Sequence, residues 1–228
     1  MKKLIFLIVV FPLTIISAQQ VKVGIKAGVN YAILNGDYEV WFDVKPRTFP
    51  YVGAFAEIMI SEKIFLQPEM IYSPQGIGYE SEEFLWELIK VPVKGVSKLD
   101  YLNLPIMGKF YVAEGLSLQV GPQVGFLLSA EREIETPEII IIEEVVISEI
   151  TIIEEVVIPG MTIVNDIKRN YKNIDFGVNV GVGYELKQGL FFDARTYLGL
   201  LNANNNSVTS GLIEAQNVVL QFSVGYFF

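Results

Sequence analysis

The chain contains no cysteine and no histidine among its 228 residues. Without thiol or imidazole groups, it has no Cys-His or Ser-His nucleophile pair, no zinc site of the usual ligands and no disulfide framework. Positive charge is also scarce, since 17 basic residues face 26 acidic ones and the formal net charge is −9. Such an acidic chain is poorly suited to nucleic acid. The composition therefore disfavours a histidine-dependent enzyme and a nucleic-acid-binding protein, and no cofactor is predicted.

A second absence concerns long apolar runs, because the sequence has just one, at its N-terminus. Two lysines precede a nearly unbroken apolar stretch from Leu4 to Ile16, and small residues follow at Ser17-Ala18. This is the layout of a secretory signal peptide, whereas the alternative, a spanning anchor, requires about 20 apolar residues. We expect residues 1–18 to be a cleaved signal peptide. The exported part, residues 19–228, then carries 26 acidic and 15 basic residues, a net charge of −11.

The remaining hydrophobicity alternates with polar and small residues. Even-numbered positions from Val218 to Phe228 are apolar or aromatic, whereas the odd-numbered ones include Gln221 and Ser223. A period of two predicts β-strands. The alternating runs reach 11 to 13 residues, which exceeds the ~5 or 6 usual in soluble sheets and suits the ~9 to 11 of a tilted bilayer-spanning strand. Because the edge groups of an open sheet would stay unpaired in hydrocarbon, the sheet must close.

We therefore predict an all-β fold, an eight-stranded antiparallel transmembrane β-barrel in the bacterial outer membrane. The strands are expected at residues 21–34, 48–60, 64–78, 99–112, 116–130, 171–186, 190–201 and 215–228. Three connections are tight, at residues 61–63, 113–115 and 187–189, and four are long, at about 35–47, 79–98, 131–170 and 202–214. Outer-membrane barrels typically alternate short periplasmic turns with long extracellular loops in this way.

Five short segments stand out within these strands. They are Leu66–Ser73, Tyr101–Pro105, Gly121-Pro122, Gly181–Leu186 and Asp193–Tyr197. Together they resemble the PorT-like outer-membrane β-barrel domain family of the Bacteroidetes envelope, and the resemblance covers nearly all of the mature chain. It implies a small porin-like barrel without assigned chemistry. It also implies, as an alternative function, an accessory role in a type IX secretion system.

Several charged side chains are expected to face the barrel interior. The predicted lumen charge network consists of Lys26, Glu57, Glu69, Lys109, Glu185, Asp193 and Arg195. An eight-stranded barrel is just wide enough for side chains to fill it, so we expect a plugged lumen, with a narrow small-solute channel as an alternative. Buried charges must pair or be solvated by trapped water, because an isolated one costs several kcal/mol. Paired carboxylates acting as acid and base would need substrate access, which a filled lumen does not offer, so no enzyme activity is predicted.

The last strand ends on an aromatic residue, Phe228, preceded on the same face by Tyr226. This ending resembles the signal by which the barrel assembly machinery captures the final strand of a substrate through strand addition. The same residues also suit a lipid-facing strand, and both interpretations can hold. We expect the assembly machinery as a partner during biogenesis.

The third long connection, at about 131–170, contains a tandem repeat. Glu138–Ile147 recurs as Glu149–Ile158 with a single substitution. Its β-branched residues favour strands, but two apolar faces interrupted by adjacent glutamates suit neither lumen nor bilayer. We expect an acidic extracellular hairpin that prolongs strands five and six and turns near Ser148. A barrel of ten strands instead of eight is the open alternative.

Residues 131–158 hold nine Glu and one Arg, so most of the negative charge is concentrated at this projection. The hairpin is predicted to bind a partner by strand addition or to bind divalent cations that bridge to lipopolysaccharide; a variable loop without a ligand is the alternative. The candidate residues are Glu143, Glu144, Glu154 and Glu155. Expected partners are outer-membrane lipid, lipopolysaccharide and an unidentified envelope protein. The predicted function is a structural or surface-interaction role through the extracellular loops.

Overall fold

The computed structural model describes residues 21–36, 43–85, 89–147, 150–204 and 215–228. The predicted signal peptide at residues 1–18 lies outside these ranges. The elements in chain order are β1 Val21–Gly36, β2 Asp43–Met59, β3 Ile64–Leu85, β4 Ile89–Tyr111, β5 Leu116–Thr136, β6 Ile139–Ile147, β7 Ile150–Ile158, β8 Met161–Asp166, the 3-10 helix η4 Lys168–Asn170, β9 Ile174–Glu185, β10 Leu190–Gly199 and β11 Ala215–Phe227. Within the described ranges, no helix has the length and apolarity to cross a bilayer.

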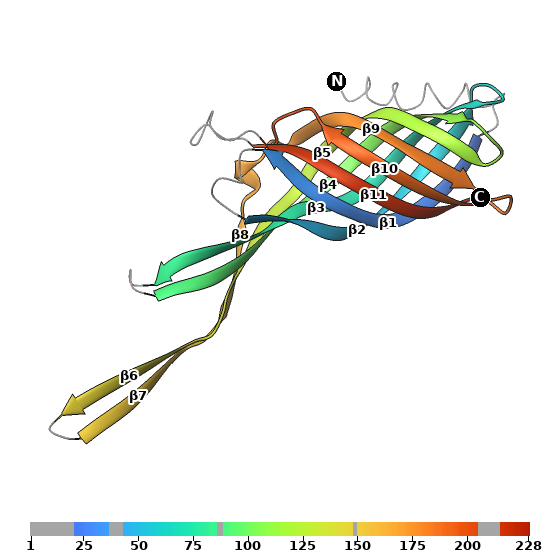
Figure 1. Cartoon of the computed structure of the whole chain (residues 1–228). Coiled ribbons are helices and arrows are strands. Elements are labelled where there is room, and N and C mark those ends of the chain that lie inside the picture. Colours follow the sequence, from blue (N-terminus) through green and yellow to red (C-terminus); the bar gives the residue numbers. More distant parts are fainter. Residues whose placement is uncertain (1–20, 37–42, 86–88, 148–149, 205–214) are drawn as a thin grey trace.

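Eight strands close into a ring. Neighbours pair antiparallel in the order β1-β2-β3-β4-β5-β9-β10-β11, and β11 pairs with β1 to complete the circle. A closed ring leaves no edge with unpaired backbone groups. The prediction of an all-β, eight-stranded antiparallel barrel is therefore confirmed. The alternative of ten barrel strands is wrong for the described chain, because β6, β7 and β8 lie outside the ring (Figure 1).

The short turns lie at the end of the barrel where the chain ends (Figure 1). The glycines that close two of them, Gly115 and Gly189, have φ angles of +75° and +85°. A side chain with a Cβ disfavours this conformation, which explains glycine as the last residue of both turns. Backbone hydrogen bonds fix each turn, for example from the amide of Gly189 to the carbonyl oxygen of Leu186 at 3.0 Å.

The outer wall of the ring is apolar on every strand. Representative outward side chains, each 43–56% exposed, are Ile25 and Val29 on β1, Val52 on β2, Met70 on β3, Ile106 on β4, Leu118 and Val120 on β5, Val180 and Val182 on β9, Phe192 on β10, and Phe222 and Val224 on β11. An apolar surface that encircles a protein needs a lipid environment to cover it. Tyr31 and Tyr72 near one rim, and Phe110, Tyr184 and Tyr226 near the other, are exposed on the same wall.

Part of the sheet continues past the rim of the barrel. β3 and β4 stay paired out to Leu85 and Ile89, and β5 stays paired with β4 out to Glu135 and Lys94. β8 then pairs along the far end of β5, and the start of β2 pairs with β3. We call this extension, residues 43–46, 77–85, 89–100, 129–136 and 161–166, the overhang (Figure 1).

The overhang corrects the predicted strand ends. β3, β4 and β5 have 22, 23 and 21 residues, so the segments expected as loops at about 79–98 and after residue 130 are largely paired strands. The prediction ended each strand where apolar alternation ended, because apolar outward residues mark only the part within the bilayer. Beyond it, opposite charges such as Lys94 and Glu135 face each other across strands and support pairing in water. The sixth barrel strand, β9, begins at Ile174 instead of residue 171.

The tandem repeat forms β6 and β7, a separate two-stranded antiparallel sheet that projects farther than the overhang (Figure 1). Its register places Glu143 opposite Glu154. The expected turn at Ser148 lies outside the described residues. The expectation that the hairpin prolongs strands five and six is wrong in one respect: β8 pairs with β5, but η4 separates β8 from the sixth barrel strand, β9.

Candidate functional site

The lumen of the barrel is filled by side chains that alternate with the outward apolar ones. Its charged members are Lys26, Glu57, Glu69, Lys109, Asp175, Asp193 and Arg195, each at most 6% exposed. Six of them belong to the predicted lumen charge network, and Glu185, the remaining member, lies at the mouth of the barrel on the side of the short turns. The strand period of two determines which side chains enter the lumen.

Four of these charges meet in one cluster, which we call the Glu69 cluster. Glu69 accepts a hydrogen bond from Arg195 Nη1 at 2.7 Å through Oε1 and pairs with Lys26 Nζ at 2.5 Å through Oε2. Arg195 Nη2 donates to Asp193 Oδ2 at 2.9 Å. Two cations and two carboxylates thus compensate each other, as burial of charge requires. The members come from β1, β3 and β10, so the cluster ties three strands together.

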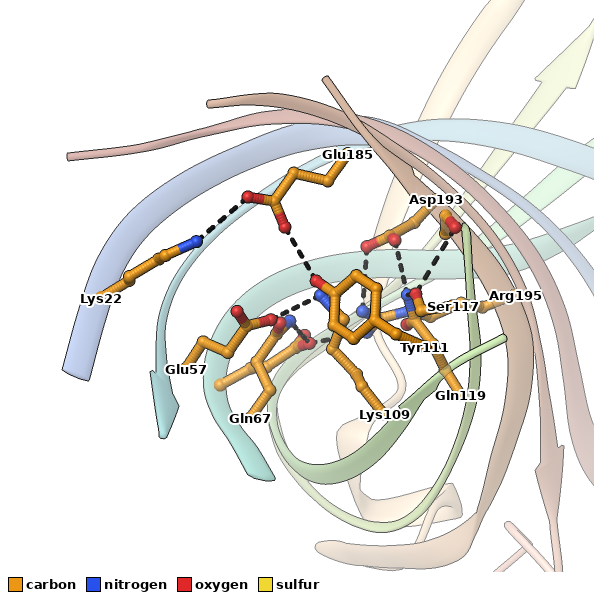
Figure 2. Close-up of polar contacts among 12 residues, drawn as sticks. Lys22, Glu57, Gln67, Lys109, Tyr111, Ser117, Gln119, Glu185, Asp193 and Arg195 are labelled. Atoms are coloured by element: carbon orange, nitrogen blue, oxygen red, sulfur yellow. Dashed lines mark hydrogen bonds and ion pairs between the residues drawn. The ribbon is translucent and has the colours of Figure 1, made fainter. Parts of the chain in front are cut away.

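Two amides extend the Glu69 cluster, as Figure 2 shows. Gln67 Nε2 donates to Glu69 Oε1 at 2.6 Å, and Gln119 Nε2 donates to Asp193 Oδ1 at 2.8 Å. Sequence reasoning missed both amides as members of the network. Each occupies a lumen-facing position of its strand, so the alternation carried the signal that could have placed them.

A second set of charges lies toward the mouth of the barrel (Figure 2). Lys109 Nζ donates to Glu57 Oε2 at 2.6 Å. Closer to solvent, Glu185 accepts hydrogen bonds from Lys22 Nζ at 3.2 Å and from the Tyr111 hydroxyl at 2.7 Å. A cavity of about 550 Å³ opens beside these residues and the short turns. The structure therefore brings all seven predicted network residues into the lumen or its mouth, in separate groups.

Apolar layers lie on both sides of the Glu69 cluster. Toward the mouth, Phe55, Phe191 and Phe227 pack with ring centroids 5.1–5.3 Å apart. A Cβ at Gly24 or Gly225 would collide with these rings, which explains glycine at both positions. At the other end, a buried cluster contains Leu99, Tyr101, Leu127, Ala130, Ile167, Tyr171 and Ala203. The charged interior is thus enclosed by packed side chains.

Asp175 is a buried carboxylate whose hydrogen-bond donors are uncharged. It accepts hydrogen bonds from Asn217 Nδ2 at 2.7 Å and from the backbone amide of Phe176 at 2.9 Å. In the Glu69 cluster, by contrast, cations and amides engage the carboxylates. In both arrangements the buried carboxylates are engaged by hydrogen bonds.

The overhang is a second charged region, and several of its charged side chains are exposed. Lys45 Nζ donates to Glu80 Oε2 at 2.5 Å, and Lys94 Nζ lies 4.0 Å from Glu80 Oε1. The hydrogen bond from Lys45 lowers the pKa of Glu80 below its ordinary value. On β5 the side chains of Glu131, Glu133 and Glu135 are exposed and share one face.

The outermost strand of the overhang, β8, pairs with β5 alone among the described strands. All six of its residues are exposed, including Met161 at 55%, Ile163 at 43% and Val164 at 59%. Natural sheets usually protect such an edge with charges, proline or a covering segment. Three exposed apolar side chains on an edge strand therefore mark a surface suited to strand addition.

The remaining predicted residues lie apart from the lumen. In the β6–β7 register Glu143 faces Glu154, Glu144 faces Ile153 and Glu155 faces Ile142; the side chains of these residues lie outside the described part of the structure. Within that part, no group of three or more acidic side chains is arranged to hold a metal ion. Tyr226 on β11 and Phe228, which directly follows this strand, are 46% and 73% exposed, with ring centroids 5.8 Å apart.

Comparison with known proteins gives one family and several similar folds. Residues 17–205 match the family described as outer membrane protein beta-barrel domain. No curated protein matches the chain significantly. Similar solved structures include Neisserial surface protein A, at 12% identity and a TM-score of 0.43, covering 90% of this chain and 97% of that one. The attachment invasion locus protein Ail of Yersinia pestis is 10% identical with a TM-score of 0.44, and the match covers 92% of this chain and 99% of that one. OprG from Pseudomonas aeruginosa is 8% identical with a TM-score of 0.40, and the match covers 92% of this chain and 97% of that one.

Proposed function

Because this chain belongs to the outer membrane protein beta-barrel domain family, we propose that it is a non-enzymatic outer-membrane protein that presents the overhang and the β6–β7 hairpin as a docking surface at the cell exterior. The filled barrel serves as the anchor of that surface in the membrane. Its lumen charges hold the strands together, whereas the overhang carries exposed charged side chains, such as Glu80, Glu131 and Glu133. The docking role goes beyond the family, which establishes the outer-membrane barrel itself.

The observation that carries this proposal is the exposed edge of β8. An extended segment of a partner can add to such an edge through backbone hydrogen bonds, and side-chain contacts then give specificity. Glu131, Glu133 and Glu135 on the neighbouring strand are exposed, and residues 131–158 hold nine Glu and one Arg. The proposed occupant is therefore an extended segment of an envelope or extracellular protein that carries basic side chains.

Site-specific photocrosslinking in native outer membranes tests this docking role. A photoreactive residue replaces Val164 on β8, and the matched control replaces Glu114 in a short turn at the opposite end. We expect a discrete protein adduct from position 164 that is lost when Glu131, Glu133 and Glu135 are all changed to Gln. An adduct that survives this triple change, or one that position 114 yields equally, would contradict strand addition of a basic segment.

The alternatives to docking are an accessory role in secretion and a narrow channel. The resemblance to PorT-like barrels supports an accessory role in type IX secretion, and loss of secreted proteins from a deletion strain would favour it. A narrow channel is opposed by the Glu69 cluster and the phenylalanine layer, because packed side chains leave ions no wet path. Planar-bilayer recordings are expected to show no steady conductance. A reproducible unitary conductance would instead support the channel function.

A further inference from the structure

On β4 and β5 the outward side chains change from apolar to polar at a defined level of the barrel. Outward side chains on β5 are apolar as far as Leu128, which is 47% exposed. The register then shifts between Asp100 and Tyr101 of β4, and the next side chains are polar. Asp100 accepts a hydrogen bond from Ser129 Oγ at 2.9 Å and lies 3.5 Å from Lys98 Nζ. This transition from apolar to ionic side chains sets the expected membrane surface.

A turn at residues 167–173 lies at this level; we call it the basic turn. The backbone amide of Ile167 donates to the Ala130 carbonyl at 2.9 Å, and Lys168 Nζ donates to the Leu128 carbonyl at 2.7 Å. Ile167 and Tyr171 are 7% and 6% exposed and belong to the apolar cluster that covers the lumen. The turn is therefore anchored on the barrel through both backbone and side chains.

The charge of the basic turn is opposite to that of its surroundings. Its sequence, Ile-Lys-Arg-Asn-Tyr-Lys-Asn, contains three cations and no acid, in a chain with a net charge of −9. Arg169 and Lys172 are exposed. The neighbouring end of β5 instead carries Glu131 and Glu133. The basic turn is thus a local cationic site on an acidic protein, at the height of the membrane surface.

Directly below the basic turn the wall is apolar and exposed. Ile174 pairs with Phe126 across β9 and β5, and the two are 52% and 39% exposed. Phe176 continues this surface on β9 at 38%. A ligand that satisfies both regions must carry an anionic group above and hydrocarbon chains below.

We propose that the basic turn binds the phosphate group of an outer-leaflet glycolipid whose acyl chains lie along Phe126, Ile174 and Phe176. Lysine and arginine near an anionic lipid surface attract its headgroups, and guanidinium groups match phosphate oxygens in geometry. The continuous apolar wall beneath the cations assigns the phosphate to a lipid instead of a free anion. The end of the barrel opposite the short turns is the one expected to meet the outer leaflet. This site is independent of docking at β8.

The experiment titrates the refolded full-length protein in nonionic detergent with monophosphoryl lipid A, with the same glycolipid after removal of its phosphate, and with inorganic phosphate. The variant is Arg169→Gln/Lys172→Gln, and the matched control is Lys63→Gln/Lys187→Gln, which removes two cations from the short-turn end. We expect about 30-fold weaker binding of the phosphorylated glycolipid by the variant and no change in the control. The single change Lys172→Gln is expected to weaken binding about 5-fold.

Retention of the folded band on unheated gels checks that each variant still forms the barrel, and the single change serves if the double variant does not fold. Equal affinity for the glycolipid with and without its phosphate would overturn the proposal. So would equal weakening in variant and control, or no weakening in either. Inorganic phosphate that binds as tightly as the glycolipid would show a free-anion site and overturn the assignment to lipid.

Discussion

The lumen and the overhang share strands β2 to β5 but use charge in opposite ways. Glu69 in the lumen and Glu80 in the overhang each lie 2.5 Å from a lysine nitrogen, yet the side chain of Glu69 is 0% exposed and that of Glu80 is 44% exposed. An exposed pair contributes at most about 1 kcal/mol, whereas breaking a buried pair leaves an uncompensated charge. Contact distance alone therefore says little about stability. The buried charges of the lumen link its strands, whereas the Lys45–Glu80 pair of the overhang remains in contact with solvent.

The largest effect is expected from breaking the Glu69 cluster. Glu69→Gln removes the carboxylate shared by Lys26 and Arg195 and leaves buried positive charge, so the free energy of unfolding should fall by about 3–5 kcal/mol. Urea unfolding of the protein in detergent micelles, followed by circular dichroism, measures this loss. Glu80→Gln is the matched control, expected to leave stability close to that of the wild type because its ion pair is exposed. Similar losses in the two variants would refute the contrast between lumen and overhang.

A smaller effect is expected from adding one methyl group to the packing of each region. In Gly24→Ala the new Cβ meets the Phe55 ring and the backbone carbonyl of Tyr226, and overpacking of this kind costs about 1–3 kcal/mol. In Gly95→Ala the new Cβ meets the Tyr79 ring in the overhang, where a side chain can move aside. The same unfolding experiment should rank Gly24→Ala well below Gly95→Ala in stability. The reverse order would show that the overhang is packed more tightly than the barrel.

The smallest effect concerns pH and the overhang alone. Because the hydrogen bond from Lys45 lowers the pKa of Glu80, the folded overhang binds a proton at Glu80 less readily than the unfolded chain does. The resulting stability is present above the ordinary pKa of a glutamate and is lost as pH falls below about 4. Hydrogen exchange of β2 and β3 amides near Glu80, corrected for intrinsic rates, should show this loss in the wild type and not in Glu80→Gln. An identical pH response in both proteins would contradict it.

Much of the barrel was predictable because the polarity of each strand residue indicates whether its side chain faces the lipid or the lumen. The alternation around Glu69 and Arg195 placed both side chains in the lumen, and the outward position of Val120 followed from the same period. The overhang was not predictable in this way. Its outward residues, such as Lys94 and Glu135, carry no apolar alternation, and their pairing depends on which strand lies opposite.

The candidate site also has a part that alternation predicted and a part that depends on contacts between strands. The predicted network contained six of the seven buried lumen charges, together with Glu185 at the mouth, but not the amides Gln67 and Gln119. An uncharged polar residue does not show from the sequence that it donates to a buried carboxylate. The edge of β8 was also missed. Its residues, Met161–Asp166, lie in a segment expected to be a loop, and their exposure is known only once β5 is seen to be their one partner among the described strands.

By itself, the sequence determined that this protein is a closed sheet with an apolar outside and a charged inside, because side-chain period and strand length are local properties of the chain. Only the tertiary structure decided which charges meet and where the sheet ends. Lys26, Glu69 and Arg195 lie far apart in sequence, and ring closure brings them within hydrogen-bonding distance. The edge position of β8 has the same origin, since it depends on β5 being its one neighbour among the described strands.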